Sequence, residues 1–414
     1  MLDIQFIREN PKVVAEKSKQ KGYDVSIPDL LELDEKRRTI QQQVDELREK
    51  RNKHAESLRS GKPTEDQIAT GKDIKNQLAK LEEKLSNLDS KYLRAIAAVP
   101  NVFSDDVPLG GEADSKEIKK FGDPKKHAKD HLDIASQKDW IDFERGAKVA
   151  GTKFYFIKGD LALLENALTQ YALEFITKRN FTYMGVPHMV NSRIATGTGF
   201  APRTDEQSDE YFIEGEDLSL IATAEMPLTG YHADEIIDED KLDLLYAALS
   251  PCYRKEAGTY GKHTRGLYRV HQFNKLEMYA YCKSEDSKSM HQKLLSIEEE
   301  FWQSIGLPYR VVNIASGDLG APAAKKYDIE YWSPVDSAYR ELTSCSNCTD
   351  YQTRNLNIRV RRKDGKVEML HSLNGTVVAL ARGLVAIIEN FQDTEGNVVI
   401  PEVLRPYMGG KEKI

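Results

Sequence analysis

The segment 253–277 carries the side chains best suited to chemistry. Its charged and aromatic residues include Arg254, Lys255, Glu256, Phe273, Lys275 and Glu277. The pattern predicts two antiparallel strands joined by a long, glycine-rich basic loop over 258–266, and residues i and i+2 of a strand share one face. One sheet face then presents a cation, carboxylates and an aromatic ring, which could hold a phosphate, an adenine and an ammonium group. The alternative is a charged hairpin on an ordinary surface.

A second candidate segment is IATAEMPLTG, which contains Thr223, Ala224 and Glu225. A hydroxyl and a carboxylate two residues apart share a strand face or a loop edge. We expect such a recess to suit a small amino acid.

A third segment, RELTSCSN, is rich in oxygen ligands. Magnesium prefers oxygen and usually keeps several waters, so Glu341, Thr343 and Ser344 are candidates for Mg²⁺ and its bound phosphates. Cys345 and Cys348 form a lone C-x-x-C with no second ligand pair in the sequence, so no structural zinc is expected.

A fourth segment places Arg382 in an apolar helical run after Asn374 and Thr376. An unpaired charge in such a position is costly, so Arg382 requires an anion. A phosphate or a nearby carboxylate could supply it.

A long helical hairpin is predicted ahead of these segments, over about 30–99. The apolar residues that keep a heptad rhythm are Leu33, Ile40, Val44, Leu47 and Leu58 in the first half, and Ile74, Leu78, Leu81, Leu85, Leu88, Tyr92, Ala95 and Val99 in the second. A Gly-Lys-Pro break at 61–63 separates the halves, which indicates an antiparallel coiled coil that folds back on itself. At 1.5 Å per residue each arm reaches roughly 40–45 Å and must project into solvent. Such a rod could serve dimerisation or contact a large partner.

The remainder of the chain predicts an α+β domain. Strand-like and amphipathic helical runs alternate, and a helix near 377–391 closes the domain. The chain has 414 residues, 30% of them charged, and a formal net charge of -7. No apolar run approaches the ~20 residues that span a bilayer, and no signal peptide or Rossmann or P-loop motif is present. We therefore expect no membrane association and a cytoplasmic location.

The four segments together resemble class II aminoacyl-tRNA synthetases, in the form seen in the seryl-tRNA synthetase family. Motif 2 is matched near 250–278, motif 1 by the helix and the FTYMGVPHMV run near 165–190, and motif 3 near 374–405. The family pattern R-E-[VIL]-[ST]-S-[CN]-S-N is matched by 340–347, and the TGTGF run at 196–200 matches a further family signature. The resemblance implies an antiparallel class II sheet flanked by helices. It also implies a tRNA-binding domain over 1–110, a linker over 111–125 and a catalytic domain over 126–414.

The resemblance also implies site roles. Serine would be held by Thr223, Ala224, Glu225, Arg254, Glu277, Asn374 and Thr376. ATP would be held by Arg254, Lys255, Glu256, Phe273, Glu341, Leu342, Thr343, Ser344 and Arg382, with Mg²⁺ at Glu341 and Ser344. Arg254 and Arg382 would stabilise phosphate charge during the reaction. Val377 and Ala381 stand where many members have glycine, so a stiffer helix start is expected.

The implied activity is ATP-dependent attachment of L-serine to tRNA(Ser) through seryl-adenylate, and also to tRNA(Sec) where that tRNA is present. The hairpin would bind the tRNA, and the enzyme would be a homodimer with tRNA bound across subunits. Three alternatives stay open: an enzyme that loads an amino acid onto a carrier protein, a non-catalytic RNA-binding paralogue, and a coiled-coil scaffold. The first normally lacks the long arm, the second would have lost charged site residues, and the third needs no middle or C-terminal segments.

Overall fold

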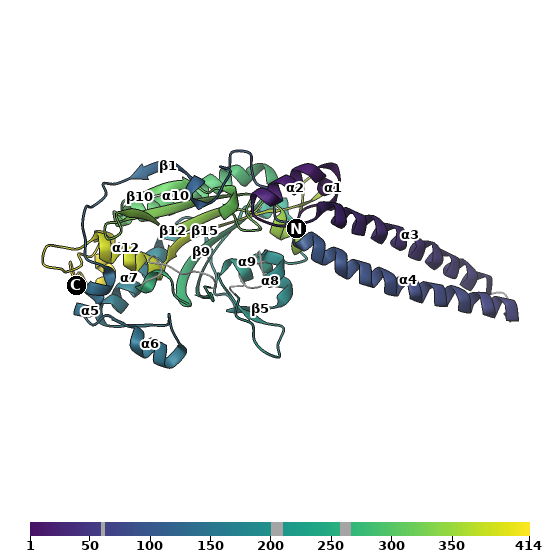
Figure 1. Cartoon of the computed structure of the whole chain (residues 1–414), viewed down its shortest axis with the longest axis horizontal. Coiled ribbons are helices and arrows are strands. Elements are labelled where there is room, and N and C mark those ends of the chain that lie inside the picture. The colour runs from purple at the N-terminus through teal and green to yellow at the C-terminus, as the bar shows by residue number, and fades with distance from the viewer. Residues whose placement is uncertain (59–62, 200–209, 257–265) are drawn as a thin grey trace. The chain divides into compact units, whose positions relative to one another are not determined.

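The computed structural model describes residues 1–58, 63–199, 210–256 and 266–414 and divides the chain into two compact units. One unit comprises 2–19 and 23–100. The other comprises Met1, 20–22 and 101–414. Figure 1 shows that the first unit is helical and that the second is built around a broad sheet with helices. Within the described residues, no helix is both long and apolar enough to cross a membrane.

The helical unit contains the predicted hairpin. Its helices are α1 (Ile4–Glu9), α2 (Pro11–Gln20), α3 (Ile27–Ser57) and α4 (Glu65–Ala97). Ser26 caps α3 with a proline in its first turn, and Thr64 caps α4 in a reciprocal capping box with Gln67. At 1.5 Å per residue, α3 and α4 span roughly 47 and 50 Å.

The seam between α3 and α4 confirms the predicted coiled coil. Its buried apolar residues are Ile40, Val44, Leu78 and Leu85, with Leu47, Leu81 and Leu88 packed against them. Polar contacts also cross the seam, because Arg37 pairs with Asp89 and Arg48 lies 2.8 Å from Glu82. The predicted tip lies partly outside the described residues, since 59–62 are not described.

An eight-stranded sheet dominates the second unit, which confirms the α+β fold. Its order is β1-β10-β11-β12-β15-β9-β8-β4, and its neighbours are antiparallel except for the parallel β4–β8 pair. The strands are β1 (Lys116–Phe121), β4 (Thr182–Tyr183), β8 (Leu244–Tyr253), β9 (Gln272–Cys282), β10 (Tyr309–Asn313), β11 (Lys325–Ser333), β12 (Ala338–Asn347) and β15 (His371–Ala379). Strand β1, which lies in the expected linker, forms one edge of this sheet.

Smaller strand pairs and helices complete the unit. The small sheets contain β2 (Ile141–Asp142), β3 (Phe156–Ile157), β5 (Met189–Val190), β6 (Ser219–Leu220), β7 (Ile236–Asp238), β13 (Arg359–Arg361) and β14 (Val367–Met369). The helices are α5 (His131–Gln137), α6 (Phe143–Ala150), α7 (Gly159–Thr177), α8 (Ser192–Thr198), α9 (Glu225–Gly230), α10 (Ser287–Ile305), α11 (Tyr351–Asn355) and α12 (Leu380–Asn390).

Strand β9 has the apolar core on one face and the polar site on the other. Leu276, Met278 and Ala280 belong to the main apolar cluster, to which α7, α10 and α12 contribute. The alternate residues, such as Glu277 and Tyr279, lie on the other face, because successive strand side chains point to opposite sides. The site therefore lies on the face opposite the main core.

Helix α12 begins later than the sequence predicts. Residues 377–379 continue strand β15, and the helix starts at Leu380. Two consecutive β-branched valines, Val377 and Val378, favour the strand there. The delayed start places Arg382 in the first turn of the helix.

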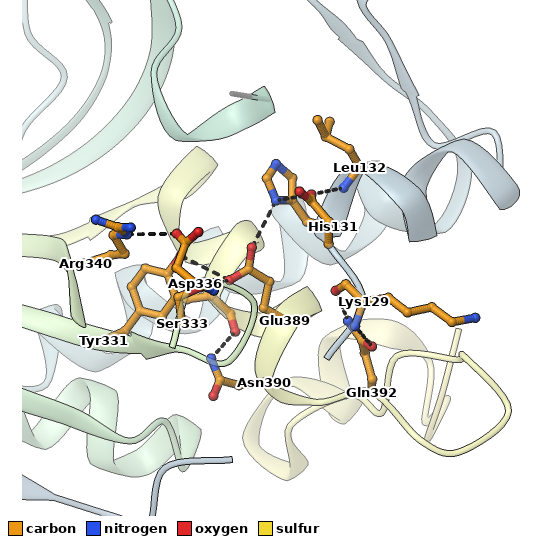
Figure 2. A network of polar contacts seen from close by, with 12 residues as sticks. Lys129, His131, Leu132, Tyr331, Ser333, Asp336, Arg340, Glu389, Asn390 and Gln392 are labelled. Carbon is orange, nitrogen blue, oxygen red and sulfur yellow. Dashed lines mark hydrogen bonds and ion pairs between the residues drawn. The ribbon is translucent and has the colours of Figure 1, made fainter. Parts of the chain in front are cut away.

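The C-terminal end of α12 is anchored by a buried polar network. Figure 2 shows His131, Glu389 and Ser333 pointing toward one another. Glu389 accepts a hydrogen bond from Ser333 Oγ at 2.8 Å, and its other carboxylate oxygen lies 3.1 Å from His131 Nδ1. The same ring nitrogen lies 3.1 Å from Asp130. These contacts hold α12, and with it Arg382, in place relative to β11.

Candidate active site

A pocket on the sheet gathers residues from strands β9, β12 and β15, helix α12 and the ends of the 253–277 segment. Of the residues predicted to bind ATP or serine, those that line it are Arg254, Glu256, Phe273, Glu341, Leu342, Thr343, Ser344, Thr376 and Arg382. Lys275, Leu267, Tyr268, Arg269, Val270, Ala379 and Ala381 complete the lining. Residues far apart in sequence are thus brought together around a polar cavity.

The part of the pocket whose residues are predicted to bind ATP contains a guanidinium group beside an aromatic ring. The Arg254 guanidinium carbon lies 5.3 Å from the centroid of the Phe273 ring, and Arg254 Nε donates to the Ala222 carbonyl at 3.3 Å. Glu256 pairs with Arg269 at 2.6 Å. A cation, an aromatic ring and a carboxylate therefore lie close together in this part of the pocket.

The predicted shared strand face for Arg254 and Glu256 is wrong. Strand β8 ends at Tyr253, and Glu256 has a φ of 50°, in the left-handed region. The alternation of side chains along a strand therefore does not position these two residues. The chain leaves the strand after Tyr253, and both side chains still line the pocket. The predicted glycine-rich basic loop over 258–266 lies outside the described residues apart from Gly266.

A second cation, Arg382, faces Glu341 across the pocket. Their side chains approach to 3.0 Å, and Arg382 lies 4.8 Å above the ring of Tyr268, whose hydroxyl donates to the Glu341 carbonyl. The Arg382 guanidinium lowers the pKa of Glu341 to about 2. The anion that Arg382 was expected to require is thus a carboxylate in this structure, the alternative left open by the sequence.

A β-bulge sets the orientation of Glu341 and Ser344. On strand β12, Glu341 pairs with Glu330 and Thr343 with Ile329, so Leu342 is an extra residue in the ladder. Glu341 and Ser344 are three apart and would lie on opposite faces of a regular strand. The extra residue brings both to the face of their partners Glu330 and Asp328.

A buried ion pair lies at the floor of the site. Lys275 pairs with Glu277 two residues along β9, and Thr223 Oγ1 donates to the same Glu277 oxygen at 3.3 Å. Glu277 and Thr376 are register partners and so share a face. The sequence missed the pairing of Lys275 with Glu277, although their spacing of two residues on a strand would have allowed it.

The neighbouring carboxylate, Glu225, begins helix α9 rather than lying on a strand or loop edge. The Thr223 hydroxyl accepts from the Glu225 backbone N–H at 3.2 Å, and the intervening Ala224 is fully buried. Glu225 accepts a hydrogen bond from Gln352 Nε2 at 2.7 Å. Burial, followed by the charge of Glu277, raises the pKa of Glu225 to about 7.

Six predicted site residues are not part of the pocket lining: Thr223, Ala224, Glu225 and Glu277, described above, and also Asn374 and Lys255. Asn374 shares a strand face with Thr376 and contacts Cys348 Sγ at 3.8 Å. Lys255 instead lies over the rings of Tyr211 and Phe212, at 5.7 and 5.6 Å. In the TGTGF run, Phe200 lies outside the described residues.

The sequence missed several residues that support the site. Gln352, Tyr268 and Arg269 contact predicted site residues directly. Glu298 on α10 contacts two of them from behind the sheet. No motif contains Glu298, and its helical spacing indicates only a core-facing position.

An antiparallel sheet whose one face gathers two arginines, an aromatic ring and carboxylates is the architecture expected of a class II aminoacyl-tRNA synthetase. The family profile "tRNA synthetase class II core domain (G, H, P, S and T)" matches residues 209–391. A second profile, "Seryl-tRNA synthetase N-terminal domain", matches residues 1–103.

Full-length relatives show which family of class II aminoacyl-tRNA synthetases the chain resembles. Proteins named Serine--tRNA ligase from Dictyoglomus turgidum and Methanocella arvoryzae are 45% and 43% identical to the chain. The first match covers 100% of this chain and 99% of the relative, and the second covers 100% of both. The chain belongs to the seryl-tRNA synthetase family.

Solved structures agree with this assignment. The seryl-tRNA synthetase of Pyrococcus horikoshii complexed with ATP matches with a TM-score of 0.90 and 38% identity, covering 100% of this chain and 99% of that one. The cytoplasmic serine-tRNA ligase of Naegleria fowleri in complex with AMP matches with a TM-score of 0.85 and 33% identity, covering 100% and 98%.

Proposed function

We propose that the chain activates L-serine with ATP and transfers the seryl group to tRNA(Ser), and to tRNA(Sec) where that tRNA is present. The observation that carries this proposal is the adjacency of two half-sites on one sheet face. One holds Arg254, Phe273, Glu341 and Arg382, and the other holds Thr223, Glu225 and Glu277. The full-length match to serine--tRNA ligases favours this function over the carrier-protein, non-catalytic and scaffold alternatives. The cytoplasm, where tRNA is charged, is the proposed location.

In the first half-site, ATP binding relies on charge and stacking. Phe273 offers a ring face for adenine, and Glu256 can accept from its exocyclic amine, with Lys255 and the 342–343 backbone nearby. Arg254 would bind the α-phosphate while the serine carboxylate attacks it, the bond to the β-phosphate breaks and pyrophosphate leaves. Arg382 would hold the γ-phosphate. Arg254 is held by the Ala222 carbonyl and the Phe273 ring, and Arg382 lies over the Tyr268 ring, so both cations are partly oriented before charge develops.

The residues proposed to hold Mg²⁺ fit that ion. The β12 bulge brings the carboxylate of Glu341 and the hydroxyl of Ser344 to one face, and Mg²⁺ takes oxygen ligands and keeps waters. When bound, Mg²⁺ would neutralise phosphate charge. Glu341 would exchange its present contact with Arg382 for the ion and free that arginine for a phosphate.

In the second half-site, each polar group of serine has a proposed partner. The carboxylate of Glu277 and the hydroxyl of Thr223 would hold the ammonium. Glu225, Asn374 and Thr376 would bind the side-chain hydroxyl, and Ala224 would lie against the Cβ. A site built to hydrogen-bond a hydroxyl rejects the analogue that lacks it by about 10⁴–10⁵, which would exclude alanine.

The helical arm is the proposed tRNA-binding element of a domain over about 1–110, with the catalytic domain over 126–414. Its exposed faces mix lysine and arginine with acids, as any solvated helix face does, so charge does not decide this role. The match of residues 1–103 to the seryl-tRNA synthetase N-terminal domain supports it. Adenylate formation needs only the sheet residues, whereas charging would need both units.

A homodimer is also proposed, through the motif 1 region. Tyr183, Met189 and Tyr231 are 44%, 45% and 55% exposed. The ring of Tyr231 packs edge to face against Tyr246, whose strand pairs with the strand of Tyr183. Exposed large apolar side chains that gather on one surface are typical of an interaction site, which supports this proposal. In a two-fold dimer, the arm of one subunit could serve the pocket of the other.

The decisive experiment is ATP–pyrophosphate exchange with each amino acid in turn, followed by charging of total tRNA. Serine alone should support exchange, and only serine acceptor tRNAs should be charged. Exchange with another amino acid, or serine exchange without tRNA charging, would contradict the proposal.

A further inference from the structure

Strands β12 and β15 separate where the active site opens. Their ladder comprises three pairs, from Asn347–Leu373 to Cys345–Gly375. Beyond that last pair the two strands carry the proposed ATP residues 341–344 and the proposed serine residue Thr376. The backbone N–H of Thr376 therefore has no partner on β12 and requires another acceptor, because an unpaired buried amide is costly.

Helix α10 supplies that acceptor from the opposite face of the sheet. Glu298, fully buried, accepts from the Thr376 backbone N–H at 2.9 Å through Oε1, and its Oε2 lies 2.8 Å from Thr343 Oγ1. Both partners are neutral groups. One carboxyl thus joins β12, called here the ATP strand, to β15, called here the serine strand, at the point where the two strands separate.

The neighbouring glycine makes room for this contact. Gly375 points toward α10, and a Cβ on it would lie 2.9 Å from Glu298 Oε1, closer than such atoms approach. A side chain at this position would require the Glu298 carboxyl to shift, so the glycine leaves the contact undisturbed. Burial raises the pKa of Glu298 well above its ordinary value. The charge of Glu277 acts in the same direction, whereas the hydrogen bonds with Thr343 and the Thr376 amide act against it.

We propose that Glu298 is a positioning residue of the active site, which sets the spacing between the ATP strand and the serine strand by bridging Thr343 and Thr376. This inference rests on the proposed function for its catalytic consequence, but not for the bridge itself. A protonated carboxyl can accept from the Thr376 amide and donate to the Thr343 hydroxyl. A glutamine can do both in the same places, whereas a methionine of similar length can do neither.

The test compares E298Q and E298M with the wild-type chain, and E300Q serves as the matched control. Glu300 is on the same helix, is 48% exposed in its side chain and pairs with Arg179 at the surface. We expect E298M to lower kcat/KM for serine in ATP–pyrophosphate exchange by about 10- to 100-fold, as small misplacements of reacting groups do. E298Q and E300Q should stay within about threefold of the wild type.

A second readout does not depend on catalysis. Amide hydrogen exchange of the peptide that contains Thr376 should accelerate at least about tenfold in E298M and stay protected in E298Q. If E298M fails to fold, T343V carries the test, with an expected loss of about tenfold in kcat/KM. The inference would be overturned if E298M kept wild-type serine-dependent ATP–pyrophosphate exchange. If E298M does not fold, the same result in T343V would overturn it. So would E298Q as impaired as E298M. A wild-type chain without serine exchange would contradict the proposed function, and the protection pattern would still decide the bridge.

Discussion

Replacing Glu277 with glutamine should affect stability and serine activation through different contacts. Lys275 and Glu277 are 7% and 1% exposed and pair with each other. E277Q leaves the Lys275 ammonium buried without its counter-ion. Removing one partner of a buried pair typically costs about 3–5 kcal/mol. For a domain of this size we expect the melting temperature to fall by roughly 5–15 °C.

The double variant K275M/E277Q separates the two effects. Replacing both charges with groups of similar volume is often nearly neutral, so most of the lost melting temperature should return. Serine activation should not return, because the proposed ammonium-binding carboxylate is still absent. Loss of one partner of a desolvated charge pair costs about 2–5 kcal/mol, which is about 30-fold or more in kcat/KM.

The assay pairs thermal unfolding with serine-dependent ATP–pyrophosphate exchange on the same preparations. The reasoning fails if E277Q has the same melting temperature as the wild type, because the Lys275–Glu277 pair would then contribute little to stability. It fails equally if K275M/E277Q recovers exchange, because Glu277 would then serve stability alone.

Three further predictions follow from the site and the arm. R382M should raise KM for ATP at least about tenfold with a smaller change in KM for serine, measured by exchange under varied ATP; equal shifts in both constants would contradict the phosphate assignment. Glu225 has a raised pKa, so the folded state binds more protons than the unfolded state between about pH 4.5 and 7. The contribution of Glu225 to stability should therefore fall by up to about 3 kcal/mol as the pH rises through that window. E225Q should flatten the dependence of the melting temperature on pH, and an unchanged slope would refute the raised pKa. Deleting 33–99 should preserve serine exchange and abolish tRNA charging; charging at wild-type efficiency would make the arm a structural rod only.

Sequence reasoning was most successful where local pattern and local structure coincide. Heptad spacing of Ile40, Val44, Leu78 and Leu85 predicts the hairpin, because a seam repeated every 3.5 residues can be buried only against another helix. The motifs around Arg254, Glu341 and Arg382 likewise predict a nucleotide-binding surface, because residue type limits which ligands a site can hold.

Only the tertiary structure decided how those residues face one another. Strand alternation would separate Glu341 from Ser344, and a bulge that depends on the pairing of β12 with β11 reunites them. Glu298 comes from a helix whose sequence shows only a core-facing stripe, and it becomes part of the site because β12 and β15 part directly above it. Register, bulges and the helix that covers a gap all depend on partner segments remote in sequence. Residue types in the sequence therefore predict which ligands the site could bind, and tertiary packing determines the geometry of the residues proposed to bind them.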